Sequence, residues 1–534
     1  MQTLTINSTI DSMAYDIIIK SGTVIDGKNA PVLGDVAIEG DKIVAVKSLG
    51  EASAKVVINA FGKYVTPGFV DITNHSDTHL TLFKYPYLES LVMQGVTTII
   101  GGNCGASLAP LASEQAIGAI KKWADPSEIN VNWNTVEEFL SSISQLRPGV
   151  NFGTLAGYGT LRRGILSGEM RPLSIEEREK LKLLLLQSMQ QGAFGLSLGL
   201  AYGHERVSVT EEIIEIGRVV SQTGGIIKMH LRSEGFEILS SVNEAIRICR
   251  ETGVPVQISH LKAIGRKAWP FLPKAIELIT HAKESGVDID FDVTPYRTTG
   301  SLLYLLVPPG ARQGGFQELF RRIDNPPERT KILEALRGHT LHYDKILITS
   351  AKIKNIVGHT LTEIAEEAGL TPEETLLETI RSNEGRVTIV GQMVSMKNTR
   401  MALQDKNSFI ASDGAGVSQD EMQTGDLVHP RSFGAFPRFL GRFTKELGIS
   451  MQDAIGKITS GPAKKLGIKG RGVLEKGAFA DVVVFDPKLI RDRATYKNPF
   501  RFSSGIEWVL VNGIPAVENG KLVQARAGKA IKRV

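Results

Sequence analysis

The sequence predicts an α/β protein with an eight-stranded barrel of βα units and a smaller β-rich module made from both chain ends. Residues 15–66 and residues 470–534 consist largely of short β-rich runs broken by turn residues. Between them, residues 67–469 alternate short buried strands with amphipathic helices, which is typical of parallel βα units. Polar side chains of the kinds that bind metals follow several of these strands.

The composition favours a globular protein with a sizeable core, and a small-molecule substrate is expected. The chain has 534 residues, 42% of them hydrophobic, which is enough for two domains with a sizeable core. Its net charge is only +5 and its basic residues are scattered, so neither a nucleic-acid nor a membrane partner is expected. The basic end, QARAGKAIKRV, is interpreted as a solvated tail. The oligomeric state stays open.

The sequence also predicts a cytoplasmic location. Cys104 and Cys249 are too few for a disulfide framework. The opening MQTLTINSTIDSMAYD has no basic segment followed by an apolar run, and no stretch of eighteen apolar residues exists.

The two β-rich ends are expected to complete one sheet module. The first end contains YDIIIKSGTVID, DVAIEGDKIVAV and KVVINAFGKYV, and the step Glu39-Gly40-Asp41 between two runs is a hairpin signal. The second end contains ADVVVFD, IEWVLVNG and KLVQARAG.

The middle region offers nine strand candidates for an eight-stranded barrel, so one of the late candidates must lie outside it. Helices are expected in EEREKLKLLLLQSMQQG, VTEEIIEIGRVVSQTG and ILSSVNEAIRICRETG. Residues 296–345 lose the alternation, and their Pro-Pro and Gly-Gly steps predict an irregular insertion over the barrel mouth. The strand candidates are GFVDI, VTTIIGG, NFGTLAG, FGLSLG, GIIKMHL, VPVQISH, VDIDFDV, VTIVGQM and SFIASD.

Four residues stand where predicted strands end: Cys104 in GGNCGASLAP, His230 in IIKMHLRSE, His260 in VQISHLKA and Asp413 in FIASDGAG. The carboxyl ends of barrel strands share one face, so these side chains are expected to converge. Taken singly, a Cys or His at a strand end is usually a packing residue. The four together predict a functional site.

The predicted site has the composition of a catalytic zinc centre. A thiolate and two imidazoles suit Zn²⁺ and leave a fourth tetrahedral position open for water, whose pKa falls to about 7 on the metal. Zinc also keeps Cys104 deprotonated. Asp413 is expected to take the proton of the water and pass it to a leaving nitrogen. The predicted chemistry is cleavage of an amide.

A second polar cluster, DITNHSDTH, follows the first barrel strand. His75 and Asp77 are candidates to face the site, whereas His79 lies farther into the loop and is expected at the surface.

Several segments resemble the N-acyl-D-amino-acid deacylases (D-aminoacylases) of the amidohydrolase superfamily. The resemblance runs from Tyr15 to Gly520 and is most specific in IIGGNCGASLAPL and HPRSFGAFPRFLG, while PGFVD and GVLEKGAFADVVVFDP are shared across the superfamily. It implies a TIM (β/α)8 barrel with a small β-sandwich domain formed from both chain ends. It also implies zinc on Cys104, His230 and His260, Asp413 as catalytic acid/base, and hydrolysis of the acyl amide of a D-amino acid.

The resemblance further implies that Lys262, Arg431 and Tyr296 hold the substrate carboxylate, for which a bidentate Arg is a suitable partner. Two positions depart from the family pattern. Thr73-Asn74-His75 stands in place of His-x-His, and Thr294-Pro295-Tyr296 in place of Tyr-Pro-Tyr. Because a hydroxyl is a poor zinc ligand, we expect one tightly bound Zn²⁺, no well-formed second site, and His75 as a weak ligand or a hydrogen-bonding group.

Two rival interpretations remain. A cyclic-amide hydrolase of the dihydroorotase or hydantoinase kind generally bridges two metals with a carboxylated Lys on a mid-barrel strand, and GAFGLSLGLAYG offers no Lys. A metal-free, non-catalytic binding protein is favoured only by Thr73. The joint presence of Cys104, His230, His260 and Asp413 argues against it.

Overall fold

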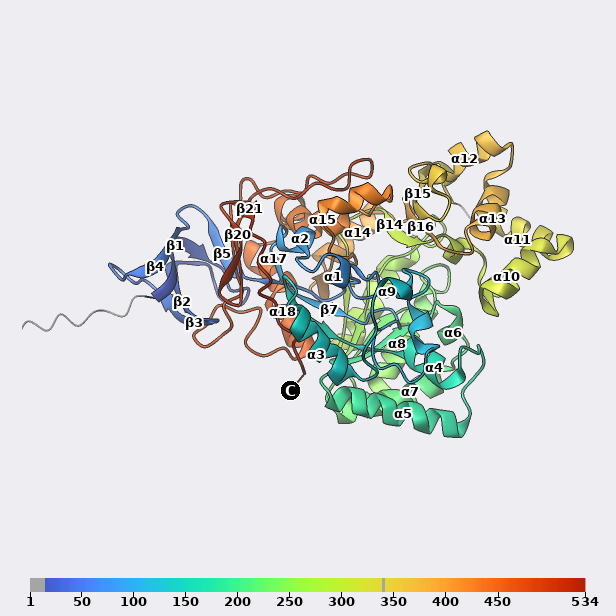
Figure 1. Cartoon of the computed structure of the whole chain (residues 1–534), viewed down its shortest axis with the longest axis horizontal. Coiled ribbons are helices and arrows are strands. Elements are labelled where there is room, and N and C mark those ends of the chain that lie inside the picture. The colour runs from blue at the N-terminus through green and yellow to red at the C-terminus, as the bar shows by residue number, and fades with distance from the viewer. Residues whose placement is uncertain (1–14, 339–340, 534) are drawn as a thin grey trace, which may run out of the picture.

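The computed structural model describes residues 15–338 and 341–533. A barrel of strands and helices forms the centre, with a β-rich module at one side and a helical excursion at the other (Figure 1). Among the residues described, no helix combines the length and the apolar character that crossing a membrane requires.

The central barrel consists of short parallel strands that are almost completely buried. Its strands are β6 (Phe69–Asp71), β7 (Val96–Gly101), β8 (Asn151–Thr154), β9 (Ala156–Gly157), β10 (Gly195–Gly199), β11 (Ile226–His230), β12 (Val256–Ile258), β13 (Ile289–Val293) and β17 (Ser408–Ile410). Both faces of these strands are covered, so polar residues in them, such as Lys228 on β11 and Asp292 on β13, are buried as well.

The barrel closes at two places. β8 and β9 are separated by Leu155 alone and therefore act as one strand that links the two parallel sheets. On the other side, a parallel bridge joins Asn74, after β6, to Gly414, after β17, and Asp413 donates its N–H to Thr73 O at 3.0 Å. The eight-stranded (β/α) barrel expected from the sequence is present.

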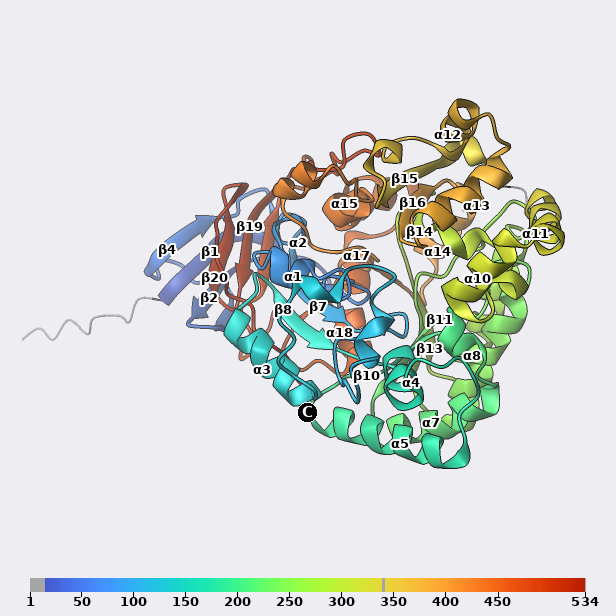
Figure 2. The same cartoon turned by 45° about the vertical axis from the view of Figure 1, so that its right-hand side comes forward.

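Amphipathic helices cover the outside of the barrel, as α5, α7 and α8 illustrate in Figure 2. In α8 the apolar residues Ile238, Val242, Ala245 and Cys249 form one buried stripe, and Gly253 ends the helix in the left-handed conformation. The helices of the barrel and its loops are α1 (Thr81–Lys84), α2 (Glu89–Val92), α3 (Val136–Leu146), α4 (Tyr158–Leu166), α5 (Ile175–Gln190), α6 (Gly203–Arg206), α7 (Thr210–Gln222), α8 (Ile238–Thr252), α9 (Phe271–Glu284), α14 (Met396–Gln404), α15 (Arg431–Arg438), α16 (Thr444–Leu447), α17 (Met451–Ile458) and α18 (Ser460–Leu466).

Both ends of the chain contribute to one nine-stranded sheet. β5 pairs antiparallel with β18, with Val65 opposite Val484, and this pair joins the N-terminal strands to the C-terminal ones. The hairpin predicted at Gly40-Asp41 connects β2 and β3. The strands are β1 (Tyr15–Val24), β2 (Val32–Glu39), β3 (Lys42–Lys47), β4 (Ala54–Asn59), β5 (Tyr64–Pro67), β18 (Val482–Phe485), β19 (Ile506–Val511), β20 (Ile514–Glu518) and β21 (Lys521–Leu522).

The excursion after β13 differs from the irregular insertion expected at 296–345. It is an ordered module that extends to residue 391, and it contains β14 (Thr299–Leu302), β15 (Ile346–Ala351), β16 (Val387–Gly391), α10 (Gly315–Asp324), α11 (Pro326–Gly338), α12 (Leu361–Ala368) and α13 (Pro372–Ser382). The strand candidate VTIVG is β16 and pairs with β14 and β15, so it is the ninth candidate outside the barrel. The Gly-Gly step stands at the start of α10 and the Pro-Pro step at the start of α11. Pro suits the first helical position.

The C-terminal segment is not the free tail that its charge suggested. Phe152 on β8 donates its N–H to Lys529 O at 2.9 Å and accepts the N–H of Ile531 at 2.8 Å. Residues 529–531 therefore lie against the barrel rather than in solvent.

Candidate metal centre

The predicted site residues meet at the carboxyl end of the barrel. His230 is the last residue of β11, His260 follows β12 by two residues, and Cys104 and Asp413 each follow their strands by three. Parallel strands present these ends on one face, so four distant segments converge.

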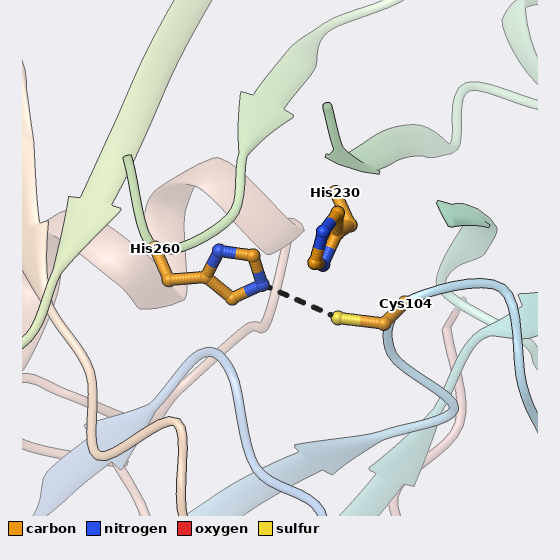
Figure 3. Close-up of side chains that lie close together, drawn as sticks. All are labelled: Cys104, His230 and His260. Atoms are coloured by element: carbon orange, nitrogen blue, oxygen red, sulfur yellow. Dashed lines mark hydrogen bonds between the residues drawn. The ribbon is translucent and has the colours of Figure 1, made fainter. Parts of the chain in front are cut away.

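Cys104, His230 and His260 form a compact group of donors (Figure 3). One ligand atom from each lies within 4.8 Å of the other two, and Cys104 Sγ lies 3.4 Å from His260 Nε2. All three side chains are buried, and His230 Nδ1 has no hydrogen-bond partner in the part of the chain that the structure describes. This donor set fits Zn²⁺ with one tetrahedral position left open.

The surroundings favour the metal-binding form of the cysteine. Burial alone raises the pKa of Cys104, but His260 and His230 outweigh this effect and hold the pKa well below its usual value. The thiolate is the form that binds metals.

The backbone at this site adopts a conformation that side-chain-bearing residues rarely take. The φ angles of Cys104, His260 and Asp413 are +53°, +40° and +49°, which lie in the left-handed region. Such residues cost about 1–3 kcal/mol each and gather at functional sites. A Cβ on Gly105 would lie 1.8 Å from Glu205 Oε1, so the turn after Cys104 requires glycine.

Glu234 supports two members of the group and was not predicted from the sequence. Its Oε1 lies 3.1 Å from His260 Nδ1 and accepts from Lys262 Nζ at 2.6 Å, and its Oε2 lies 3.8 Å from His230 Nε2. Burial raises the pKa of Glu234, yet Lys262 and the two histidines hold it well below its usual range. A carboxylate on the outer nitrogen orients an imidazole and raises its basicity. The available signal was a carboxylate four residues after His230.

Asp413 lies beside the donor group and connects to it through His75. His75 Nε2 lies 3.2 Å from Asp413 Oδ1 and 4.0 Å from Cys104 Sγ. Burial raises the pKa of Asp413, but Arg431, His260 and His75 outweigh it and keep the carboxyl ionised. Burial would lower the pKa of His75, whereas Asp413 and Cys104 raise it to about 9.

Arg431, Tyr296 and Lys262 border the same small cavity, of about 20 Å³, as His260 and Asp413. Arg431 Nη1 donates to Asp413 Oδ2 at 2.5 Å, and its buried Nε has no partner among the described residues. Tyr296 donates its hydroxyl to the Pro430 carbonyl at 3.4 Å. Lys262, expected to hold a substrate carboxylate, borders this cavity and also donates to Glu234.

Asp413 and Arg431 also border a larger cleft of about 420 Å³, whose far wall is made by β14, β15 and β16. A volume of this size accommodates a small organic molecule. His79, expected at the surface, lines this cleft and lies against Trp123, with ring centroids 5.3 Å apart. The excursion therefore forms part of the entrance to the site.

Asp77 and Thr73 have other partners. Asp77 Oδ2 accepts the Gly102 N–H at 2.6 Å, so it holds the loop that carries Cys104. Thr73 Oγ1 donates to Asp292 Oδ2 at 2.9 Å and accepts from Lys228 Nζ at 2.7 Å. Neither Asp77 nor Thr73 belongs to the group of donors around Cys104.

Known proteins resemble this chain along almost its full length. Residues 425–517 match the model of the Amidohydrolase family. A D-aminoacylase of Alcaligenes xylosoxydans xylosoxydans is 31% identical over 529 residues, which cover 98% of this chain and 99% of the relative, and an N-acyl-D-glutamate deacylase of the same organism is 29% identical over 93% of each chain.

Solved structures agree with this result. A D-aminoacylase with a binuclear metal centre, activated by one metal and attenuated by the second, superposes with a TM-score of 0.82 at 31% identity, covering 97% of this chain and all of that one. The N-acyl-D-glutamate deacylase of Bordetella bronchiseptica, complexed with zinc and a phosphonate inhibitor, gives 0.81 at 27% identity over 97% of this chain and all of that one. The chain belongs to the D-aminoacylase family of amidohydrolases.

Proposed function

We propose that this protein is a zinc-dependent deacylase that hydrolyses the acyl amide of N-acyl-D-amino acids to a carboxylate and a D-amino acid. The observation that carries the proposal is the convergence of Cys104, His230 and His260 on one point, with Asp413 beside them. The full-length likeness to a D-aminoacylase supports the substrate class and its handedness.

Cys104, His230 and His260 would hold the zinc ion. When bound, zinc supplies Lewis-acid chemistry and the activation of water near neutral pH. Glu234 keeps the ring of His260 in a fixed orientation and stays beside that of His230.

Asp413 is the proton carrier of the proposed reaction. As an ionised carboxylate it accepts a proton from the attacking water and then gives that proton to the leaving nitrogen. The C–N bond breaks, a C–O bond forms, and the free amine leaves with the proton. His75 and Arg431 fix the two oxygens of Asp413 and keep it ionised between turnovers.

Arg431 is the proposed partner of the substrate carboxylate. It borders both the small cavity and the larger cleft, and its Nε, which has no partner among the described residues, can donate a charge-assisted hydrogen bond. Tyr296 forms a wall of the same cavity. Lys262 is assigned a different role, since it acts on the metal side through Glu234.

The substrate spectrum tests the proposal. Chelator-treated protein, reloaded with zinc, is offered the N-acetyl-D and N-acetyl-L forms of Met, Leu, Glu and Asp, together with a hydantoin, and acetate or ring opening is measured. We expect acetate release from D substrates only, and only with zinc. Ring opening without acetate release would favour a cyclic-amide hydrolase, and zinc well below one per chain with no turnover would favour a non-catalytic scaffold.

Two serine variants control for the metal. Cys104→Ser removes the thiolate and is expected to lose both zinc and measurable acetate release. Cys249→Ser alters the other buried cysteine, which lies on α8, and is expected to keep both. Two unpaired buried cysteines also fit the proposed cytoplasmic location.

A further inference from the structure

Lys228 is a lysine enclosed within the barrel. It lies on β11 two residues before His230 and is only 1% exposed. Its ammonium donates to the carbonyl of Ile72 and, at 2.7 Å, to Oγ1 of Thr73. Lysine is almost never fully buried unless it is paired, so this arrangement requires a reason.

Asp292 on β13 is the counter-ion of this buried charge. Thr73 Oγ1 donates to Asp292 Oδ2 at 2.9 Å, and Asp292 Oδ1 accepts the backbone N–H of His260 at 2.8 Å. Burial lowers the pKa of Lys228, and Asp292 is the carboxylate that opposes this effect most strongly. Hydrogen bonds therefore connect the ammonium of Lys228 on β11, the hydroxyl of Thr73 after β6 and the carboxylate of Asp292 on β13. The same carboxylate binds the backbone of His260.

This chain of groups lies where a second metal would need its ligands. His75 Nε2 and Asp413 Oδ1 form, with Cys104 Sγ, an incomplete set of donors on the β6 side of the thiolate. Thr73 holds the first position of the His-x-His pattern, in which His75 holds the second. Thr73 is the residue that could complete the set.

The hydroxyl of Thr73 cannot serve as that ligand. A neutral hydroxyl binds zinc poorly, and this one already accepts from Lys228 and donates to Asp292. The other oxygen of Asp413 is held by the guanidinium of Arg431. The guanidinium of Arg431 thus contacts the incomplete set directly, and the ammonium of Lys228 bonds to Thr73. Both positive charges would repel a second metal ion in a buried site.

From this arrangement we infer that Lys228, bonded to Thr73, takes the place of a second metal ion and keeps the centre mononuclear. The solved D-aminoacylase relative has a binuclear centre whose second metal attenuates activity. This protein carries the ammonium of Lys228 in place of the second metal, so excess zinc does not attenuate its activity. The inference rests on the proposed zinc function. Lys228 acts as a positioning residue, because among the described residues its ammonium bonds to Ile72 and Thr73 and to none of the proposed metal ligands.

Zinc counting on the wild-type protein is the primary test. Metal-free protein is dialysed against increasing zinc, and the bound metal is counted by mass spectrometry, with cobalt(II) absorption as an independent measure of ligand geometry. We expect one equivalent throughout, with acetate release that does not decline as zinc rises. A second equivalent bound with similar affinity would overturn the inference.

A double variant tests the cause. Thr73→His with Lys228→Met restores an imidazole and removes the ammonium, and it is expected to bind two equivalents and to lose activity in excess zinc. Lys457→Met is the matched control. Lys457 is a partly buried lysine whose ammonium also donates to backbone carbonyls, those of Asp405 and Ser408, and it lies away from the donor group. It is expected to keep one equivalent.

The outcomes separate the inference from the proposed function. Protein that binds one zinc but releases no acetate would contradict the function and leave the inference standing. Protein that binds two zinc ions and releases acetate would contradict the inference and leave the proposed function standing. If circular dichroism shows that the double variant is unfolded, the wild-type count alone decides.

Discussion

The two sides of the barrel mouth satisfy their polar atoms in opposite ways. On the side of β7, β11 and β12, Cys104, His230 and His260 present donor atoms to a shared point, and a carboxylate stands behind them. On the side of β6 and β17, Thr73 and Asp413 already bind cations that belong to the protein. The side of β7, β11 and β12 can bind a metal ion from solution. On the side of β6 and β17 the positive charges are those of Lys228 and Arg431.

This difference shows how the side chains of one barrel fold can determine the number of bound metal ions while the backbone stays the same. Both sides lie at the carboxyl ends of parallel strands and share the same backbone architecture. Only the side chains differ, because ammonium and guanidinium groups stand where further metal ligands would be needed. The chemistry of each side can therefore be tested separately.

The largest expected effect comes from Asp413→Asn, on the β17 side. The variant cannot accept the proton of water, so kcat should fall about 10²–10⁴-fold, while the zinc content stays at the wild-type value because the three donors lie on the other side. Zinc content and the initial rate of acetate release measure this. If zinc is lost together with activity, Asp413 is a metal ligand and the two sides are not independent.

Arg431→Ala also changes the β17 side, with a smaller effect. Loss of a charge-assisted hydrogen bond of about 1.5–3 kcal/mol should raise KM for substrates with a free carboxylate, and the corresponding carboxamides should be little affected. Arg386→Ala, in the outer part of the same cleft, is the control. A fall in kcat with unchanged KM would mean that Arg431 acts only through Asp413 and does not bind the substrate carboxylate.

The convergence of Cys104, His230 and His260 could be predicted from the sequence because these residues lie at the ends of regularly arranged strands. Cys104, His230 and His260 each end an apolar run, and parallel strands bring such ends together. The pairing of β16 was not predictable in the same way. A buried run such as VTIVG has the same composition in a barrel and in a separate antiparallel sheet, and only its neighbours differ.

Charged residues were the weakest point of the prediction. Glu234 and Lys228 are charged, and a charged residue in a sequence is expected at the surface unless its partner is known. Their partners are brought close only by the folded barrel: Lys228 bonds to a residue 155 positions away, and Glu234 to one 26 positions away. The sequence offered one local signal for Glu234, its place four residues after His230, and none for the bond between Lys228 and Thr73.

The smallest expected effect tests the residue that the sequence did not reveal. Glu234→Gln keeps the shape of the side chain but removes the charge behind His260 and His230, so zinc affinity should fall about 10–100-fold. Competition with a chromogenic chelator measures the dissociation constant, and acetate release at saturating zinc should change less than the affinity does. Glu237→Gln alters an exposed carboxylate in the same loop and is the matched control. If both variants bind zinc like the wild type, the carboxylate is not part of the metal side, and the two sides differ only in their donors.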